Sequence, residues 1–227
     1  MNLFKHIKYL IIGLTLAACI NSNAFDFSKA SKKGIFKVNF TPLQIGFIGN
    51  LFDTDNVYGF SFALPMSYNK NNYGLATGIW GKAKDQRGVQ LNMLNLAQEL
   101  NGVQIGLVGI VKNAKENNSL ASGLQLNLFN VSETLFGFQS GIFNQSGRLS
   151  GIQSGIVNLS DQGLQFGVVN IFNSPQTLKG TDSYQSDARV QIGLYNHSSN
   201  SAFQIGFLNY NKNAFLPIFP LFNFSID

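Results

Sequence analysis

One short pattern of apolar and polar residues recurs along most of this chain. It reads Gly-apolar-Gln-x-Gly/Asn-apolar-apolar-Asn-apolar. In the copy that begins at Gly102, Val103 and Ile105 share one face, whereas Gln104 and Gly106 share the other. Alternation over six to eight residues predicts a β-strand, because successive side chains of a strand point to opposite faces. Clear copies begin at Gly88, Gly102, Gly123, Gly137, Gly151 and Gly163, with shorter versions from Leu43, Val190 and Phe203.

The charged residues lie almost entirely between these copies, in polar segments whose composition is typical of turns. The alternation shifts where two apolar residues adjoin near the end of each copy, which predicts a bulge or a strand end there. The two longest connections are Lys112–Ser122 and Phe172–Ala188, and in an up-and-down meander they emerge on the same side. Further strands are expected at Phe36–Phe40, Leu43–Gly49, Tyr58–Met66, Gly74–Trp80, Gln191–Asn196, Phe203–Tyr210 and Phe215–Phe224, about a dozen in all.

Two architectures fit the repeated strand. The favoured one is an antiparallel meander of about 12 strands, closed as an outer-membrane β-barrel whose apolar face meets lipid and whose Gly/Gln/Asn face lines a narrow interior. The low charge and the aromatic ending Phe219–Phe224 favour it, although Pro217 and Pro220 each remove a ladder donor. The alternative is a β-solenoid of roughly 14-residue coils, in which Gln and Asn form ladders and the Val/Ile/Leu face fills a dry core. The intervals 88→102, 123→137 and 137→151 are 14 residues, but 102→123 is 21 and 151→163 is 12.

Composition narrows the possible classes of protein. The 227 residues are enough for one domain, and only 12% of them are charged, which is little charge for a soluble surface. The formal net charge of +5 includes Lys5 and Lys8 of the N-terminal segment, and the remainder is scattered. The sequence therefore predicts no nucleic-acid partner.

The N-terminus is predicted to be an export signal. Lys5, His6 and Lys8 precede the apolar stretch 9–18, which is too short to span a membrane as a helix. One interpretation is cleavage after Ala24, which makes 1–24 the signal peptide. The other is a lipobox that ends in Cys19, which makes 1–18 the signal and Cys19 an acylated N-terminus. Residues 25–227 are expected to form a single all-β repeat domain.

The repeats resemble bacterial surface-repeat proteins known best from spirochaete genomes. The copies at Gly151–Asn158 and Phe203–Tyr210, with the ending Phe215–Phe224, carry the resemblance, which covers about Gly88 to Phe224. It implies export and a location in the outer membrane or at the cell surface, and it implies no catalytic residues. The segment before Gly88 departs from the repeat.

No group of residues points to a reaction, a metal or a cofactor. His197 is the only histidine after the N-terminal segment, and it lies in a polar segment without a nucleophile motif. The short acidic turn formed by Asp53, Asp55 and Asn56 lacks the rest of a calcium loop. Trp80 is expected to anchor at an interface or in the core. Candidate paired carboxylates for glycoside chemistry fall in separate turns, at Glu99, Glu116, Glu133 and Asp161.

The sequence thus predicts a non-enzymatic outer-membrane or surface-exposed repeat protein. The protein is expected to be a structural or narrow-pore β-barrel, and its expected partner is outer-membrane lipid. The alternative is a lipid-anchored surface β-solenoid that acts as a binding or adhesion module. The sequence identifies no protein or glycan ligand.

Overall fold

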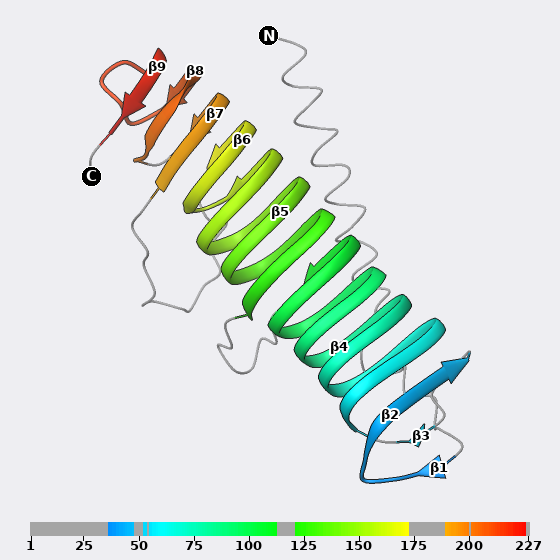
Figure 1. Cartoon of the computed structure of the whole chain (residues 1–227). Coiled ribbons are helices and arrows are strands. Elements are labelled where there is room, and N and C mark those ends of the chain that lie inside the picture. Colours follow the sequence, from blue (N-terminus) through cyan, green and yellow to red (C-terminus); the bar gives the residue numbers. More distant parts are fainter. Residues whose placement is uncertain are drawn as a thin grey trace. The chain divides into compact units, whose positions relative to one another are not determined.

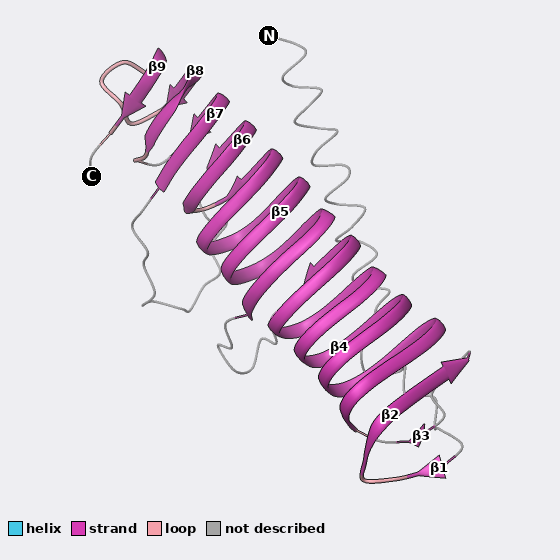
Figure 2. Ribbon diagram, in the orientation of Figure 1, coloured by secondary structure: helices cyan, strands magenta, loops and turns pink. Residues whose placement is uncertain are grey.

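The protein is all-β in the part of the chain that the computed structural model describes, which is residues 36–47, 52–53, 55–112, 121–172, 189–199 and 201–225. Figure 2 shows these elements as strands without a helix among them. The chain divides into the units Met1–Lys32 and Lys33–Asp227, and all described residues belong to the second. The strands are β1 (Phe36–Lys37), β2 (Phe40–Phe47), β3 (Phe52–Asp53), β4 (Asn56–Val111), β5 (Ala121–Ser160), β6 (Gly163–Phe172), β7 (Arg189–Ser198), β8 (Phe203–Asn211) and β9 (Ile218–Phe224).

The main sheet is parallel, so the expected antiparallel meander is wrong for these residues. Its strands are ordered β2-β4-β5-β6-β7-β8-β9, and every pairing is parallel except that of β8 with β9. The sheet is open, with β2 and β9 at its ends, rather than closed as a barrel requires. Parallel neighbouring strands cannot be joined by tight hairpins. The short polar connections therefore cannot be the hairpin turns of a meander.

That path is a series of coils, each of which lies against the one before it. In Figure 1, β4 and β5 appear as continuous ribbons that wind through several coils. The register places like residues of successive repeats together: Gln153 with Gln165, and Gly155 with Gly167. Longer connections leave this register intact, because Gly102 still pairs with Gly123 across the 113–120 segment, which lies outside the described residues. The irregular repeat intervals therefore do not disturb the alignment of the coils.

The interior of the coils is largely polar, so the expectation that the Val/Ile/Leu face of a solenoid fills a dry core is wrong for these residues: that face is exposed, and the amide face is buried. We number each repeat from its first Gly, so that Gln is position 3, the second Gly position 5 and Asn position 8. The Gln side chains form a ladder in which each Nε2 donates to Oε1 of the preceding coil, at 2.7 Å from Gln153 to Gln139 and 3.0 Å from Gln165 to Gln153. The members are essentially inaccessible to solvent and include Gln90, Gln104, Gln125, Gln139, Gln153, Gln165, Gln191 and Gln204.

The Asn side chains form a second ladder with the opposite direction of donation. Asn144 Nδ2 donates to Asn158 Oδ1 at 2.9 Å, and Asn158 Nδ2 donates to Asn170 Oδ1 at 2.9 Å. Each Nδ2 group also donates to a backbone carbonyl of the next coil, such as that of Phe166 for Asn158. Buried amides are tolerated only when they are hydrogen-bonded, and a ladder supplies those bonds from one coil to the next. The buried apolar residues are fewer than the buried polar ones, and Ala97, Leu100, Val111, Leu135 and Leu149 form a cluster among them.

Glycine allows the coils to approach each other closely. A Cβ atom at Gly155 would overlap the carbonyl oxygen of Gly141 in the preceding coil, and one at Gly167 would overlap that of Gly155. The first glycine of the repeat is under the same constraint, and at Gly137 it also adopts a φ of 144°, which other residues rarely adopt. The glycines therefore serve the packing of the backbone, as their position inside strands indicated.

Candidate functional site: an apolar ridge opposite a charged edge

The most regular exposed feature of the described chain is a ridge of apolar side chains at position 6 of the repeat. The alternation shifts at this point: position 5 faces inward, positions 6 and 7 both face outward, and position 8 faces inward again. The strand thus turns a corner where the sequence predicted a bulge or an end, and position 6 occupies its tip. All ridge residues are at least 41% exposed, and they are Ile79, Met93, Leu107, Leu128, Ile142, Ile156, Val168, Leu194 and Phe207.

Apolar columns flank the ridge. Position 7 supplies Phe129, which is 41% exposed, and positions 2 and 4 supply side chains such as Leu124 and Ile105. The same surface continues onto β9, because Phe222 pairs with Ile205 and Phe224 with Phe203. Soluble monomers rarely expose a continuous apolar patch above a few hundred Å². At a coil spacing of about 4.8 Å, this one extends for about 40 Å along the stack.

The charged side chains lie on the opposite side of each coil. From Gly74 to Ser199, no charged residue occupies positions 2–8 of any repeat; charges occur at position 1 and after position 8. We call this side the charged edge; its described members in that range are Lys82, Lys84, Asp85, Arg87, Glu99, Lys112, Glu133, Arg148, Asp161 and Arg189.

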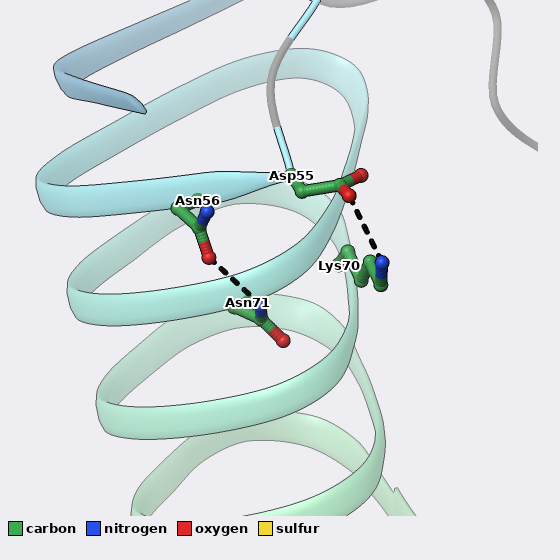
Figure 3. Close-up of polar contacts among 4 residues, drawn as sticks. All are labelled: Asp55, Asn56, Lys70 and Asn71. Carbon is green, nitrogen blue, oxygen red and sulfur yellow. Dashed lines mark hydrogen bonds and ion pairs between the residues drawn. The ribbon is translucent and has the colours of Figure 1, made fainter. Parts of the chain in front are cut away.

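The charged edge begins in the first coils with contacts between successive coils. Figure 3 shows Lys70 Nζ and Asp55 Oδ2 in an ion pair at 2.9 Å, and Asn71 Nδ2 donating to Asn56 Oδ1 at 2.8 Å. Each contact joins residues 15 apart in the sequence, one coil to the next. The expected acidic turn thus has Asp55 and Asn56 engaged with the neighbouring coil, and the side chain of Asp53 is not described.

Amphipathic aromatic residues lie between the ridge and the charged edge. Trp80 and Tyr195 occupy position 7, and His197 and Tyr210 occupy position 9. The rings of His197 and Tyr210 stack with their centroids 4.7 Å apart, and His197 Nδ1 lies 3.5 Å from the Tyr195 hydroxyl. Tyrosine and tryptophan are favoured where an apolar medium meets water, because they have an apolar ring and a polar tip.

The remaining candidate residues do not assemble into a chemical site. Glu99, Glu133 and Asp161 lie along the charged edge on different coils, and Glu116 is outside the described residues. The ring neighbours of His197 are the two tyrosines. Among the described residues, no three His, Cys, Asp or Glu side chains are placed to hold a metal ion. Cys19 and Ala24, the candidate lipidation and cleavage residues, also lie outside the described part.

Asp161 is the most buried carboxylate among the described side chains of the charged edge. Its Oδ1 accepts a hydrogen bond from the Leu149 backbone N–H at 3.1 Å, and Arg189 Nε donates to its carbonyl oxygen at 3.2 Å. Burial raises the pKa of the Asp161 carboxyl above its ordinary value, against the opposing effects of the Leu149 hydrogen bond and of Arg148 and Arg189. The charged form is therefore less stable in the folded protein than in the unfolded chain.

This shift predicts a pH dependence of folding. Because the folded pKa is the higher one, the contribution of Asp161 to stability is complete below the unfolded value of about 3.9 and is lost as the pH rises through the folded pKa. We expect Asp161→Asn to keep the acceptor for Leu149, to flatten this part of the pH profile and to be at least as stable at pH 7. Asp161→Ala is the control, since it removes both the charge and the acceptor and should be less stable than Asp161→Asn. The urea midpoints of all three proteins are measured between pH 4 and 7. If the midpoint changed equally with pH in the wild type and in Asp161→Asn, the pH dependence would not come from Asp161.

Within the described part of the chain, no helix has both the length and the hydropathy needed to cross a membrane. Comparison of the chain with protein-family models, curated proteins and solved structures gives no match.

Proposed function

We propose that this protein is an exported, non-enzymatic repeat protein of the bacterial outer membrane or cell surface, built as a β-solenoid. The proposal is that it binds a lipid surface through the apolar ridge, with the ridge among the acyl chains and the charged edge in water. The observation that carries it is the segregation of charge: the ridge runs through coil after coil, and the charges keep to the other side. The predicted export signal and the resemblance to surface-repeat proteins support the location.

The chemistry of the ridge favours lipid over a folded protein partner. A specific protein interface combines apolar contacts with about one hydrogen bond per 100–200 Å². Position 6 offers only aliphatic, Met and Phe side chains, and positions 2 and 7 are almost equally apolar. Such a surface has little to direct a specific polar contact, whereas a lipid surface requires none. The arrangement corresponds to the amphipathic helices that lie in a membrane interface, with coils in place of helical turns.

The expected energy is sufficient for binding. Complete burial of one aliphatic side chain contributes about 1.5–3 kcal/mol. Roughly half of each ridge side chain is exposed, so each coil can contribute about 1 kcal/mol when the ridge enters the acyl region. The proposed role is structural and not that of a pore, because buried Gln and Asn ladders occupy the interior of the coils together with the apolar cluster.

Flotation with phosphatidylcholine vesicles tests the proposal. We expect the double variant Ile142→Asp and Ile156→Asp to lose at least tenfold in vesicle affinity, because it places two carboxylates on neighbouring coils of the ridge. The control, Asn101→Asp with Ser150→Asp, adds the same charge at position 14 on the charged edge and should bind like the parent. A Cys19→Ala background removes any acyl group from the comparison, and circular dichroism verifies folding.

The single tryptophan provides a second measurement. Trp80 adjoins the ridge residue Ile79, so its fluorescence should shift to shorter wavelength on vesicle binding and should be quenched by brominated lipids. Two outcomes would exclude the ridge as the lipid-binding surface. The first is equal flotation of the ridge variant and the control variant. The second is binding that requires anionic lipid and is lost only in the charged-edge variant. If the parent protein did not bind vesicles but bound a protein or glycan, and the ridge substitutions abolished that binding, the result would instead favour an adhesion module.

A further inference from the structure

The C-terminal end of the stack exposes a second group of apolar side chains, which adjoins the apolar columns beside the ridge at Phe222 and Phe224 and extends beyond them. It is formed by the turn after β8 and by β9, and its side chains are among the most exposed in the described chain. Phe215 is 97% exposed, Leu221 71%, Ile218 61% and Leu216 49%. These side chains lie at the last strand of the sheet, which has a described neighbour only in β8. We call this group, with Phe222 and Phe224, the end cluster.

The register separates half of the end cluster, namely Phe215, Leu216 and Ile218, from the surface beside the ridge, whereas Leu221, Phe222 and Phe224 pair with positions 5, 4 and 2 of the last repeat. The turn follows Asn211, which pairs with Ser198 beyond position 8 of the repeat, and Ile218 pairs with Tyr210. Phe215 and Leu216 are therefore on the side of the charged edge, across the coil from ridge residue Phe207. A lipid surface that covers the ridge leaves this part of the end cluster in water.

The backbone of β9 is a poor template for a further strand. Pro220 has no N–H to donate, and Leu221 adopts a φ of 70°, a left-handed conformation that is rare for leucine. The pairing of β8 with β9 is also irregular between Gly206 and Asn209. The amide ladder ends here as well, since Gln204 Oε1 has no hydrogen-bond partner among the described residues. Proline and irregular pairing are the features by which edge strands resist the addition of another chain, so a partner must pack on side chains.

We propose that the end cluster is the interface of a tail-to-tail dimer, in which the C-terminal ends of two copies of this chain pack together about a two-fold axis. A two-fold axis places the same patch on both sides, so the surface must be self-complementary. The end cluster meets this condition because it is apolar throughout and Lys212 is the only charged residue from Ser201 to Ser225. The end cluster therefore offers almost no charge by which a charged partner could be recognised.

The exposed area is sufficient for a stable pair. A fully exposed aromatic side chain presents about 150–250 Å², so the exposed fractions of Phe215, Phe222 and Phe224 together present about 300–500 Å² per copy. Leu216, Ile218 and Leu221 add to this area. Two copies thus present about 600–1,000 Å² from the aromatic side chains, and burial of the whole end cluster, aliphatic side chains included, reaches about the 1,000 Å² that a specific interface requires. Closure about a two-fold axis also limits the assembly to two copies, whereas pairing between opposite ends would produce filaments.

The oligomeric state in lipid-free buffer tests the dimer. We expect the full exported chain to sediment as a concentration-dependent dimer, and Phe215→Ser with Leu221→Asn to raise the dimer dissociation constant at least tenfold. Both positions are highly exposed, and asparagine tolerates the left-handed conformation of residue 221, so folding should be retained. Phe207→Ser is the matched control: it removes a ridge phenylalanine that is 79% exposed and should leave the dimer unchanged.

The same variants separate this proposal from lipid binding. Phe207→Ser should weaken vesicle binding, and the end-cluster variant should still bind at saturating lipid. A wild-type chain that is monomeric at all concentrations, or a dimer that persists in the end-cluster variant, overturns the dimer and leaves the lipid proposal intact. Loss of the dimer in Phe207→Ser alone would place the contact on the ridge and would overturn it too.

Discussion

Gly155→Ala is expected to destabilise the protein by more than about 4 kcal/mol, or to prevent folding. The added methyl group would overlap the carbonyl oxygen of Gly141, and the Asn144 amide lies against the same point. Extra atoms in a packed core usually cost about 1–3 kcal/mol, because neighbouring side chains can shift. Here the obstacle is the backbone of the preceding coil, which can move only if both hydrogen-bonded ladders separate. Urea denaturation followed by circular dichroism measures the loss.

Ser154→Ala is the matched control for this variant. It alters the adjacent residue of the same coil, where the side chain faces outward, and its backbone carbonyl still accepts from Asn144 Nδ2. We expect a change within about 0.5 kcal/mol, as for an ordinary surface substitution. If Gly155→Ala retained the wild-type denaturation midpoint, the coils would have to be further apart than described.

Exchange of Gly109 and Asn127 is expected to rescue two variants that are each unstable alone. Gly109 stands at position 8, where the other clear repeats have the ladder Asn, and the side chain of Asn127 from the next coil occupies the gap. Asn95 Nδ2 donates to Asn127 Oδ1 at 3.2 Å, and Asn127 Nδ2 donates to Asn130 Oδ1 at 2.8 Å. The ladder thus remains continuous through a coil that lacks its own Asn.

Each single substitution should cost about 2–4 kcal/mol. Asn127→Gly leaves Asn130 Oδ1 without this donor and opens a cavity, and Gly109→Asn places a second side chain where Asn127 already lies. The double variant Gly109→Asn with Asn127→Gly has the pattern of the other coils and should lie within about 1 kcal/mol of the wild type. A double-mutant cycle from urea denaturation measures the coupling. Additive losses would show that Asn127 does not replace the missing residue.

A second pair provides an independent repetition of this test. Gly81 also stands at position 8, and Asn92 of the next coil fills its place and donates to Asn95 Oδ1 at 2.9 Å. Both exchanges are visible in the sequence, since an Asn at position 5 follows each Gly at position 8. A repeat pattern in which Gly and Asn are interchangeable at position 5 does not reveal this pairing. The pairing becomes evident only when successive repeats are known to be neighbours.

The strands could be predicted from the sequence, but the way they pair could not. Alternation identifies one apolar and one amide face in each repeat, and this part of the prediction is confirmed by the burial of Gln153 and Asn158. The 14-residue intervals favoured coils, whereas the intervals of 21 and 12 residues favoured a meander. The structure shows why the irregular intervals misled: the extra residues lie beyond position 8, so Gly102 and Gly123 still pair. Interval length carries no information on pairing when insertions are confined to one edge.

Only part of the candidate site could be predicted from the sequence. The apolar face and the exclusion of charge from the repeats were both evident, and they led to the expectation of lipid as a partner. The ridge itself was not predicted, because it depends on the corner between Leu107 and Val108, where two successive side chains face outward. The sequence shows that the alternation of apolar and polar residues is interrupted here, but it does not show which of the adjoining side chains face outward. The near burial of Asp161 also escaped prediction, since it depends on how the 12-residue coil lies against its neighbours.

The opposed directions of the two amide ladders determine how such a stack can grow. In an α-helix all peptide dipoles point the same way and leave partial charges at the ends. Here Gln153 donates toward the N-terminal coil, and Asn144 donates toward the C-terminal one, so the two rows of amide dipoles oppose each other. Most coils contribute one Gln and one Asn, and the axial dipoles of the two largely cancel. Coil number can thus change by whole repeats without accumulating charge at the ends, which leaves length free to vary by duplication.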